Sequence, residues 1–304
     1  MSADVSVVLA GGHFYEGPRW HEGRLWVSDF YGHQVISTTR EGDARVEAVV
    51  PNQPSGLGWL PDGRLLIASM LDQLVLRREP SGELVEHADL STYTGGHLIN
   101  DMWVDTDGTA YVSTFSFNPF AGDPLRTAPV VMVRPDGSSA IAADGFYVPN
   151  GIVALPGSVI VVAETMGQRL TAFDRNPSGE LTGRRPWAAF GPAPVSDDVA
   201  AVAATLAASP DGIAVPDAEG AIWVADAYGN RVMRVREGGE ILDDIPLAYT
   251  NTYACALGGV DGSTLFICAA PDFDAAARSA AAEAQVLAVK VAVPAGVAAP
   301  ARRS

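Results

Sequence analysis

The order of hydrophobic and polar residues repeats along the whole chain. Each repeat opens with a polar or small residue, continues with an apolar stretch, and passes through a turn with Gly or Asp-Gly into a second apolar stretch. Two short apolar stretches around such a turn predict a β-hairpin, because Asp and Gly tolerate the positive φ that the turn requires. The copies are EGPRWHEGRLWVSD from Glu16, SGLGWLPDGRLLIAS from Ser55, NDMWVDTDGTAYVST from Asn100, NGIVALPGSVIVVAE from Asn150, DGIAVPDAEGAIWVAD from Asp211 and the less regular YACALGGVDGSTLFICA from Tyr253.

The spacing of the copies matches the blades of a β-propeller. Successive starting residues lie 39, 45, 50, 61 and 42 residues apart, and propeller blades take about 40–50 residues. Alternating segments at 73–78, 130–134, 169–174 and 231–236 supply outer strands. Residues 285–293 would complete the last blade, and residues 5–10 would close the ring against it. We therefore expect one domain over residues 1–304, an all-β six-bladed propeller with four antiparallel strands in each blade.

Three segments interrupt the repeat. Residues 118–126 form a Pro-containing loop, whereas residues 196–208 and 271–284 are rich in Ala and favour short helices. As connections within or between blades, they are expected to shape the mouth of the central channel. A solenoid fits the repeat less well, because no copy carries a helix and neither end looks like a capping repeat.

Composition narrows the classes of partner. The net charge of −16 and the pI near 4.6 argue against nucleic acids and anionic lipid surfaces, which require a basic footprint. No apolar run approaches the ~18 residues of a membrane helix, and residues 1–10 show no signal-peptide pattern. Cys255 and Cys268 each lie in an apolar, strand-like segment, so reduced core thiols are expected. A cytoplasmic protein without a membrane segment is predicted.

The first residue of each copy points to a site. The innermost strand of every propeller blade lines the channel, so residues at one register converge at one depth. Here the residues are Glu16, Ser55, Asn100, Asn150 and Asp211, with a small residue near Ala254 in the sixth copy. Two carboxylates packed together without a cation would repel each other. Oxygen ligands from Asp, Glu and Asn suit a hard cation such as calcium, magnesium or manganese.

Several of these motifs resemble the senescence marker protein/regucalcin/gluconolactonase family of lactone hydrolases. The resemblance covers nearly the whole chain and rests on EGPRW (16–20), NDMWVDTDGTAYV (100–112), PNGI (149–152) and SPDGIAVPDAEGAIWVA (209–225). It implies a six-bladed propeller with a single divalent metal ion. It also implies that Glu16, Asn150 and Asp211 hold this ion, and that Asn100 lies in the same pocket and contacts substrate or metal.

One position departs from the family pattern. Sugar-lactone members of the family place an Arg two residues before the Asn that matches Asn100, and this chain has Leu98 there. The difference indicates a less polar lactone, or another ester, in place of a plain sugar lactone. His97 and the aromatic cluster of Phe115, Phe117 and Phe120 are candidates for contributing to such a pocket.

The resulting hypothesis is metal-dependent hydrolysis of a small-molecule cyclic ester. The metal would polarise the carbonyl oxygen, and a water molecule would attack the carbonyl carbon. Asp211 is the expected general base, since it would sit at the metal with one oxygen free, and Asp101 is the second candidate. Calcium is the expected ion, and magnesium, manganese, zinc and iron stay open as alternatives.

Two other functions fit the same residues. A phosphotriester or aryl ester hydrolase could use the same metal site, and a calcium-binding propeller without enzymatic activity would need no substrate at all. A metal-free propeller of the strictosidine synthase type is disfavoured by the joint presence of Glu16, Asn150 and Asp211. The sequence contains no G-x-S-x-G, G-x-G-x-x-G or P-loop motif, so neither a serine hydrolase of the α/β type nor a nucleotide cofactor is indicated.

Overall fold

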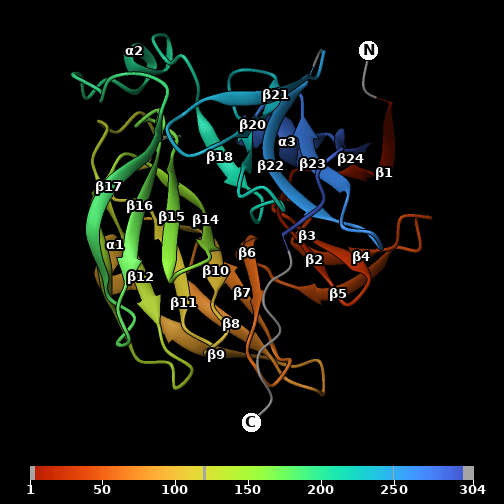
Figure 1. Ribbon diagram of the computed structural model, residues 1–304. Helices are drawn as coiled ribbons and strands as arrows, with labels where there is room; N and C mark the ends of the chain where they lie inside the picture. Colours follow the sequence, from red (N-terminus) through yellow and green to blue (C-terminus); the bar gives the residue numbers. More distant parts are fainter. Residues whose placement is uncertain (1–3, 119–120, 249, 297–304) are drawn as a thin grey trace.

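The computed structural model describes residues 4–118, 121–248 and 250–296. Six four-stranded antiparallel sheets surround a central channel and follow one another in chain order (Figure 1). Blade 1 consists of β2 (Tyr15–His21), β3 (Arg24–Asp29), β4 (Gln34–Thr38) and β5 (Arg45–Val49). Blade 2 consists of β6 (Pro54–Trp59), β7 (Leu65–Ser69), β8 (Leu74–Arg78) and β9 (Leu84–Asp89). Blade 3 consists of β10 (Ile99–Val104), β11 (Ala110–Thr114), β12 (Ala128–Val133) and β13 (Ser139–Phe146).

Blades 4 to 6 repeat this plan, with one exchange of strands at the end. Blade 4 consists of β14 (Pro149–Leu155), β15 (Val159–Glu164), β16 (Arg169–Arg175) and β17 (Leu181–Ala189). Blade 5 consists of β18 (Pro210–Ile213), β19 (Ile222–Asp226), β20 (Arg231–Val235) and β21 (Ile241–Pro246). Blade 6 consists of β22 (Asn251–Gly258), β23 (Thr264–Ala270), β24 (Ala284–Lys290) and β1 (Val5–Gly12). The predicted six-bladed all-β fold is confirmed.

The first strand of the chain closes the ring. β1 is the outermost strand of blade 6 and pairs antiparallel with β24, from Val5 opposite Val289 to Gly12 opposite Ala284. Residues that are far apart in sequence thus share one sheet, so the blades cannot separate at this point without breaking the ladder. The expected closure by residues 5–10 is confirmed.

Apolar side chains between neighbouring blades form the core. Between blades 2 and 3, for example, Leu66 packs in one cluster with Met102 and Val131, and all three are fully buried. Between blades 1 and 6, the rings of Trp20 and Phe266 stack with centroids 5.4 Å apart. Each large apolar side chain buried in this way contributes roughly 1.5–3 kcal/mol, and the alternating apolar residues of the repeat supply both faces of every sheet.

Glycine after the first repeat residue lets the inner strands crowd around the channel. A Cβ atom on Gly151 would lie 2.6 Å from the backbone nitrogen of Ile213, and one on Gly212 would lie 2.4 Å from the Cβ of Ala254. Such distances are not tolerated, so these positions require Gly for close backbone approach. Blades 3 and 6 carry Asp101 and Ala254 at this register.

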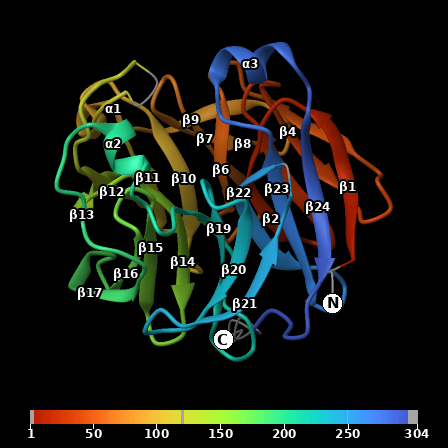
Figure 2. The same cartoon turned by 90° about the horizontal axis from the view of Figure 1, so that it is seen from above.

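Three short helices lie toward one end of the propeller (Figure 2). They are α1 (Ser91–Thr94), α2 (Val199–Ala203) and α3 (Ala275–Ala280). Asp198 caps α2 by accepting from the Ala201 N–H at 3.0 Å, and Asp274 caps α3 by accepting from the Ala277 N–H at 2.8 Å. The helices expected in 196–208 and 271–284 are thus present, whereas α1 was not predicted.

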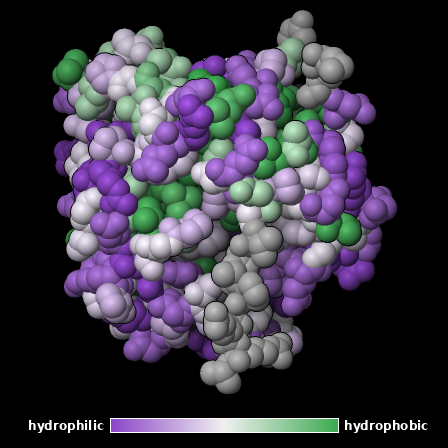
Figure 3. Space-filling view, in the orientation of Figure 1, coloured by the Kyte–Doolittle hydropathy of each residue, from purple (hydrophilic) through white to green (hydrophobic). Residues whose placement is uncertain are grey.

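Hydrophilic residues cover most of the outer edge of the molecule (Figure 3). Cys255 and Cys268 are buried and unpaired, as expected. Within the described residues, no helix has the length and apolar character needed to span a membrane.

Candidate functional site

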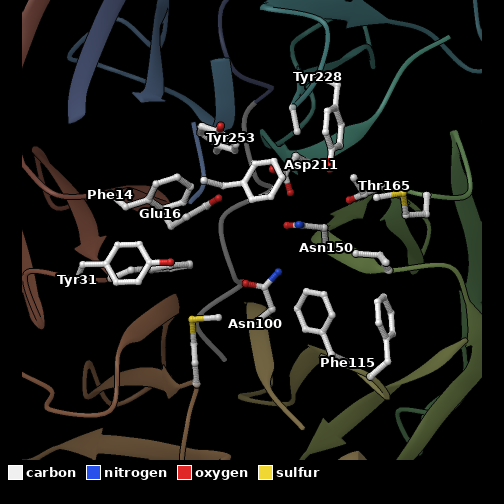
Figure 4. Close-up of a pocket in the computed structure, with 17 residues that line it drawn as sticks. Phe14, Glu16, Tyr31, Asn100, Phe115, Asn150, Thr165, Asp211, Tyr228 and Tyr253 are labelled. Carbon is white, nitrogen blue, oxygen red and sulfur yellow. The ribbon is translucent and has the colours of Figure 1, made fainter. Parts of the chain in front are cut away.

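Four residues that open copies of the repeat meet in one cavity, called here the inner cavity. Each is the second residue of its strand: Glu16 of β2, Asn100 of β10, Asn150 of β14 and Asp211 of β18 (Figure 4). All four are buried, with at most 8% of each residue exposed. The cavity volume is about 130 Å³, less than the ~300 Å³ at which drug-sized ligand pockets begin. Only a small reacting group fits at this depth.

Ser55, at the same register in blade 2, supports the site from one side without lining it. Its hydroxyl donates to the Oδ1 of Asn100 at 3.1 Å. This bond orients the amide so that its nitrogen points toward Asn150 (Figure 4). In this orientation Asn100 presents a hydrogen-bond donor to the cavity.

The sixth blade contributes Tyr253, which corrects the expectation of a small residue near Ala254. Thr252 pairs with Ala269 in the same way that Pro149 pairs with Glu164 in blade 4. The residue after Thr252 therefore occupies the position of Asn150, and it lines the inner cavity. Ala254 instead takes the position of the crowded glycines and packs in the core. The irregular start of the sixth copy concealed this one-residue offset.

Burial makes the charged forms of the two carboxylates costly. Desolvation, followed by the charge of Asp101, raises the pKa of Glu16 to about 8. Desolvation and the charge of Glu16 raise the pKa of Asp211 well above its usual range, although the nearby Asn150 amide opposes this shift. A cation between the two carboxylates would remove the cause of both shifts, because an opposite charge favours the ionised form.

Two buried polar atoms of the inner cavity make no hydrogen bond to any described residue. They are the Oδ1 of Asp211 and the hydroxyl oxygen of Tyr253. By contrast, the Oε2 of Glu16 accepts from the Gly17 N–H at 2.9 Å. A buried polar group without a partner costs about 1–3 kcal/mol. The hydrogen-bonding capacity of these two atoms is not met in the geometry of the described residues.

Asp101 lies beside the inner cavity and does not line it. It stands at the crowded glycine register, and its Oδ1 accepts from Arg19 at 2.8 Å and from its own neighbour Met102 at 2.7 Å. Arg19 also donates to the carbonyl oxygens of Leu57, Pro18 and Met102. This ion pair connects the inner strands of blades 1, 2 and 3 beneath the carboxylates. The role of Asp101 as a general base stays a prediction, and the ion pair of Asp101 with Arg19 disfavours that role.

The other predicted substrate contacts divide into two groups. Phe115 and Phe117 line the inner cavity, with ring centroids 6.1 Å apart. Leu98 packs against these rings and does not line the inner cavity. His97 is half-buried in the loop before β10, and it does not line the inner cavity either. Phe120 lies outside the described residues.

Aromatic residues that the sequence analysis missed complete the wall of the inner cavity. They are Phe14, Phe30, Tyr31, Tyr228 and Phe273. A signal for two of them was present: Tyr31 and Tyr228 both stand two residues after the acid that ends the second strand, in DFYG and DAYG. Aligning the ends of the second strands would have placed both at the channel mouth.

A second, larger cavity adjoins the first and is called here the outer cavity. It shares Met166, Tyr228 and Phe273 with the inner cavity, and its volume is about 710 Å³. Each of the three segments that interrupt the repeat contributes residues to the wall of the outer cavity. These residues are 122–124, 197–200 and Phe273. Their expected role at the mouth of the channel is confirmed for the described residues.

The donor set fits a hard cation. Carboxylate and amide oxygens are the ligands that calcium and magnesium prefer, and Glu16, Asp211 and Asn150 supply both kinds. Among the described residues, no three His, Cys, Asp or Glu side chains come together in a metal-binding cluster. An ion here would therefore depend on the Asn150 amide as well as on Glu16 and Asp211, because the amide oxygen of Asn100 accepts from Ser55.

These features define a six-bladed propeller with a carboxylate–amide site at one end of its channel. The chain belongs to the SMP-30/Gluconolactonase/LRE-like family, whose conserved region matches residues 14–271. This family includes gluconolactonases and regucalcin. The matched span contains Glu16, Asn100, Asn150 and Asp211.

Relatives with curated sequences match only in part. Regucalcin from Sus scrofa is 27% identical over 185 residues, which are 57% of this chain and 54% of the pig protein. Regucalcin from Xenopus laevis is 39% identical over 64 residues, 21% of each chain. The match thus spans about half of the pig protein and about a fifth of the frog protein.

Solved structures share the fold over almost the whole chain. The calcium-binding protein regucalcin from Agrobacterium tumefaciens has a TM-score of 0.77 at 21% identity, covering 97% of this chain and 96% of its own. A luciferin-regenerating enzyme has a TM-score of 0.77 at 16% identity, covering 97% and 99%. A gluconolactonase from Xanthomonas campestris has a TM-score of 0.71 at 22% identity, covering 96% and 90%. At such identities the likeness shows the fold alone.

Proposed function

We propose that this protein is a divalent-metal-dependent hydrolase that opens a lactone other than a plain sugar lactone. The observation that carries the proposal is the pair of buried carboxylates, Glu16 and Asp211, at one register of the inner strands, with the Oδ1 of Asp211 lacking any partner among the described residues. Membership of a family that includes lactonases supports the reaction class.

Glu16, Asn150 and Asp211 would hold the ion, and Asn100 would contact the substrate. Calcium is our first choice, because the ligands are oxygens and a structural relative is a calcium-binding protein. When bound, the ion supplies positive charge that stabilises negative charge on the carbonyl oxygen. The amide nitrogen of Asn100, oriented by Ser55, would add a hydrogen bond to the substrate.

Asp211 would move the proton. Its free Oδ1 accepts a proton from water as the water oxygen bonds to the carbonyl carbon. The bond between that carbon and the ring oxygen then breaks, and the proton passes to the ring oxygen, so that lactone and water yield a hydroxy acid. The aromatic wall limits the entry of bulk water.

The wall also limits the substrate. No Lys, Arg or His lines the inner cavity among the described residues, so the hydroxyls of a sugar lactone would find few charged or strongly polar partners. Unpaired polar groups are penalised in such a setting. Leu98, packed behind Phe115 and Phe117, contributes to the same apolar character.

The test is lactone hydrolysis measured with a pH indicator. Protein treated with a chelator would be assayed alone and after addition of calcium, magnesium, manganese, zinc or ferrous iron, beside the Asp211→Ala variant. We expect turnover only with metal, and its loss in the variant. Metal binding without turnover of lactones, but with turnover of a phosphotriester or aryl ester, would favour that hydrolase. Binding with no turnover of any ester would favour a calcium-binding propeller.

A further inference from the structure

Tyr253 is a buried polar residue of the inner cavity that the proposed reaction does not use. It is 3% exposed, and its hydroxyl is the second unpartnered polar atom of the inner cavity. The neighbouring Asn251 amide donates instead to the carbonyl oxygen of Pro271 at 3.0 Å. By hydrogen-bond geometry the Tyr253 hydroxyl has no partner among the described residues, although Asn251 lies near enough to lower its pKa.

The ring of Tyr253 is held firmly in place. Its centroid lies 4.7 Å from that of Phe14 at an interplanar angle of 50°, and 6.5 Å from that of Phe273 at 81°. Tilted and edge-on aromatic contacts of this kind are favourable. The side chain lies between Phe14 and Asp211 at the edge of the polar ring (Figure 4). The ring is thus held in the wall of the inner cavity, close enough to Asp211 for the charge of that carboxylate to act on the hydroxyl.

The hydroxyl can act only as a neutral group near pH 7. Burial, with a smaller contribution from the charge of Asp211, raises the pKa of Tyr253 far above its usual value. The proton therefore stays on the oxygen, and Tyr253 offers a hydrogen-bond donor. An acceptor on a ligand would satisfy it.

The surroundings select an uncharged ligand. The inner cavity has no cationic side chain among its described residues, and Asp123, Asp197 and Asp198 line the outer cavity. With a net charge of −16 for the whole chain, this entrance repels anions. The inner cavity of about 130 Å³ accommodates the ester group, and an apolar substituent would extend toward Met166 and Tyr228, which both cavities share.

We infer that Tyr253 is a catalytic residue that donates a hydrogen bond to the carbonyl oxygen of an uncharged lactone with an apolar substituent. The inference rests on the proposed function. In hydrolysis this oxygen gains negative charge as water adds to the carbonyl carbon, and a fixed donor stabilises that charge. Tyr253 takes no proton in the reaction, and the atoms balance as described for Asp211.

The test compares Tyr253→Phe with wild-type protein and with Tyr93→Phe. Tyr93 is a matched control, because its hydroxyl donates to the Ser139 carbonyl oxygen at 2.8 Å and lies outside both cavities. With metal present, Tyr253→Phe should lower kcat/KM on an aryl- or alkyl-substituted lactone roughly 10²-fold, mainly through kcat. Tyr93→Phe should leave it unchanged. Polyhydroxylated and carboxylate-bearing lactones should be poor substrates.

Two further measurements separate this role from a structural one. Tyr253→Phe should leave Tm unchanged or higher, because the hydroxyl lost has no partner, whereas Tyr93→Phe should lower it by about 1–3 °C. By calorimetry, metal affinity should be unchanged in Tyr253→Phe. An unreactive lactam with an apolar substituent should bind the variant ~10-fold more weakly than the wild type.

Each contrary result has a distinct meaning. If wild-type protein opens no lactone with any metal, the proposed function fails, and the lactam still tests Tyr253: equal affinity for both proteins would overturn its role. If lactones are opened equally well by wild type and Tyr253→Phe, only the role of Tyr253 fails. Loss of metal affinity in the variant would also overturn it, and preference for a polyhydroxylated lactone would overturn the substrate class.

Discussion

Inner strands of the blades line both ends of the central channel, yet the two ends differ in how their polar groups are satisfied. At the end opposite the inner cavity lies a back cavity of about 360 Å³, lined by Arg19, Trp20, His21, Trp59 and Trp103 among others. There Arg19 donates four hydrogen bonds, one to Asp101 and three to backbone carbonyl oxygens. His21 stacks on Trp59 with centroids 3.8 Å apart.

The inner cavity is smaller but chemically less complete, although the back cavity also leaves one atom, the indole nitrogen of Trp103, without a partner among the described residues. Its two carboxylates have raised pKa values, and two of its buried polar atoms lack partners among the described residues. The difference indicates that unmet hydrogen bonds and unfavourable charge mark a reactive site better than volume does. The Arg19–Asp101 ion pair separates the two ends, so each can be altered alone.

The largest expected effect is that of Asp211→Asn on catalysis. This change keeps the shape of the side chain and removes both its charge and its capacity as a base. We expect kcat/KM for lactone opening to fall by about 10³-fold or more, and metal affinity to weaken in titration calorimetry. The Tm of the metal-free variant should not fall, because a neutral amide replaces a carboxyl whose ionised form is unfavourable at this depth. Unchanged turnover would exclude Asp211 as the base.

Breaking the Arg19–Asp101 ion pair should mainly lower the free energy of unfolding. Arg19→Met leaves Asp101 buried, only 4% of its side chain exposed, without its ion-pair partner. Removing one partner of a buried pair costs about 3–5 kcal/mol, measurable by urea unfolding. The double variant Arg19→Met/Asp101→Asn should recover part of this loss. A single variant as stable as the wild type would show that the pair does not hold blades 1 to 3 together.

The pH dependence of the metal-free protein should report the inner cavity. The pKa of Glu16 is raised from 4.5 to about 8 in the folded protein, so between these values the folded state holds more protons than the unfolded chain. Stability should therefore fall as pH rises from about 5 to 8, by an amount on the order of a few kcal/mol.

Two controls sharpen this experiment. Glu16→Gln should flatten the pH dependence of Tm, and saturating calcium should reverse it, because bound metal favours the deprotonated carboxylates. If Tm of wild-type protein is independent of pH over this range without metal, Glu16 does not titrate as described.

The smallest effect is expected at the back cavity. His21→Ala removes the stacking on Trp59, worth about 1 kcal/mol, and should lower Tm slightly. It should leave kcat/KM and metal affinity within about twofold of the wild type, because His21 lies at the opposite end of the channel. A strong loss of activity would contradict the independence of the two ends.

Much of the site could be located from the sequence because the repeat imposes one register on every blade. The residues that open the copies, Glu16, Asn100, Asn150 and Asp211, do line one cavity. Prediction failed where a copy departs from the pattern. In blade 6 the register falls on Tyr253 and not near Ala254, and Asp101 stands where four other blades have Gly, which removes it from the cavity.

The sequence by itself determined the blades, their order and the depth at which the polar residues converge, since these follow from local alternation and a regular period. Only the tertiary structure decided which of these polar atoms find partners. Asp101 meets Arg19 from another blade, Asn100 meets Ser55, and the Asp211 Oδ1 and Tyr253 hydroxyl meet no described residue. Such contacts join residues tens of positions apart, so they exist only when the ring has closed and the inner strands face each other across the channel.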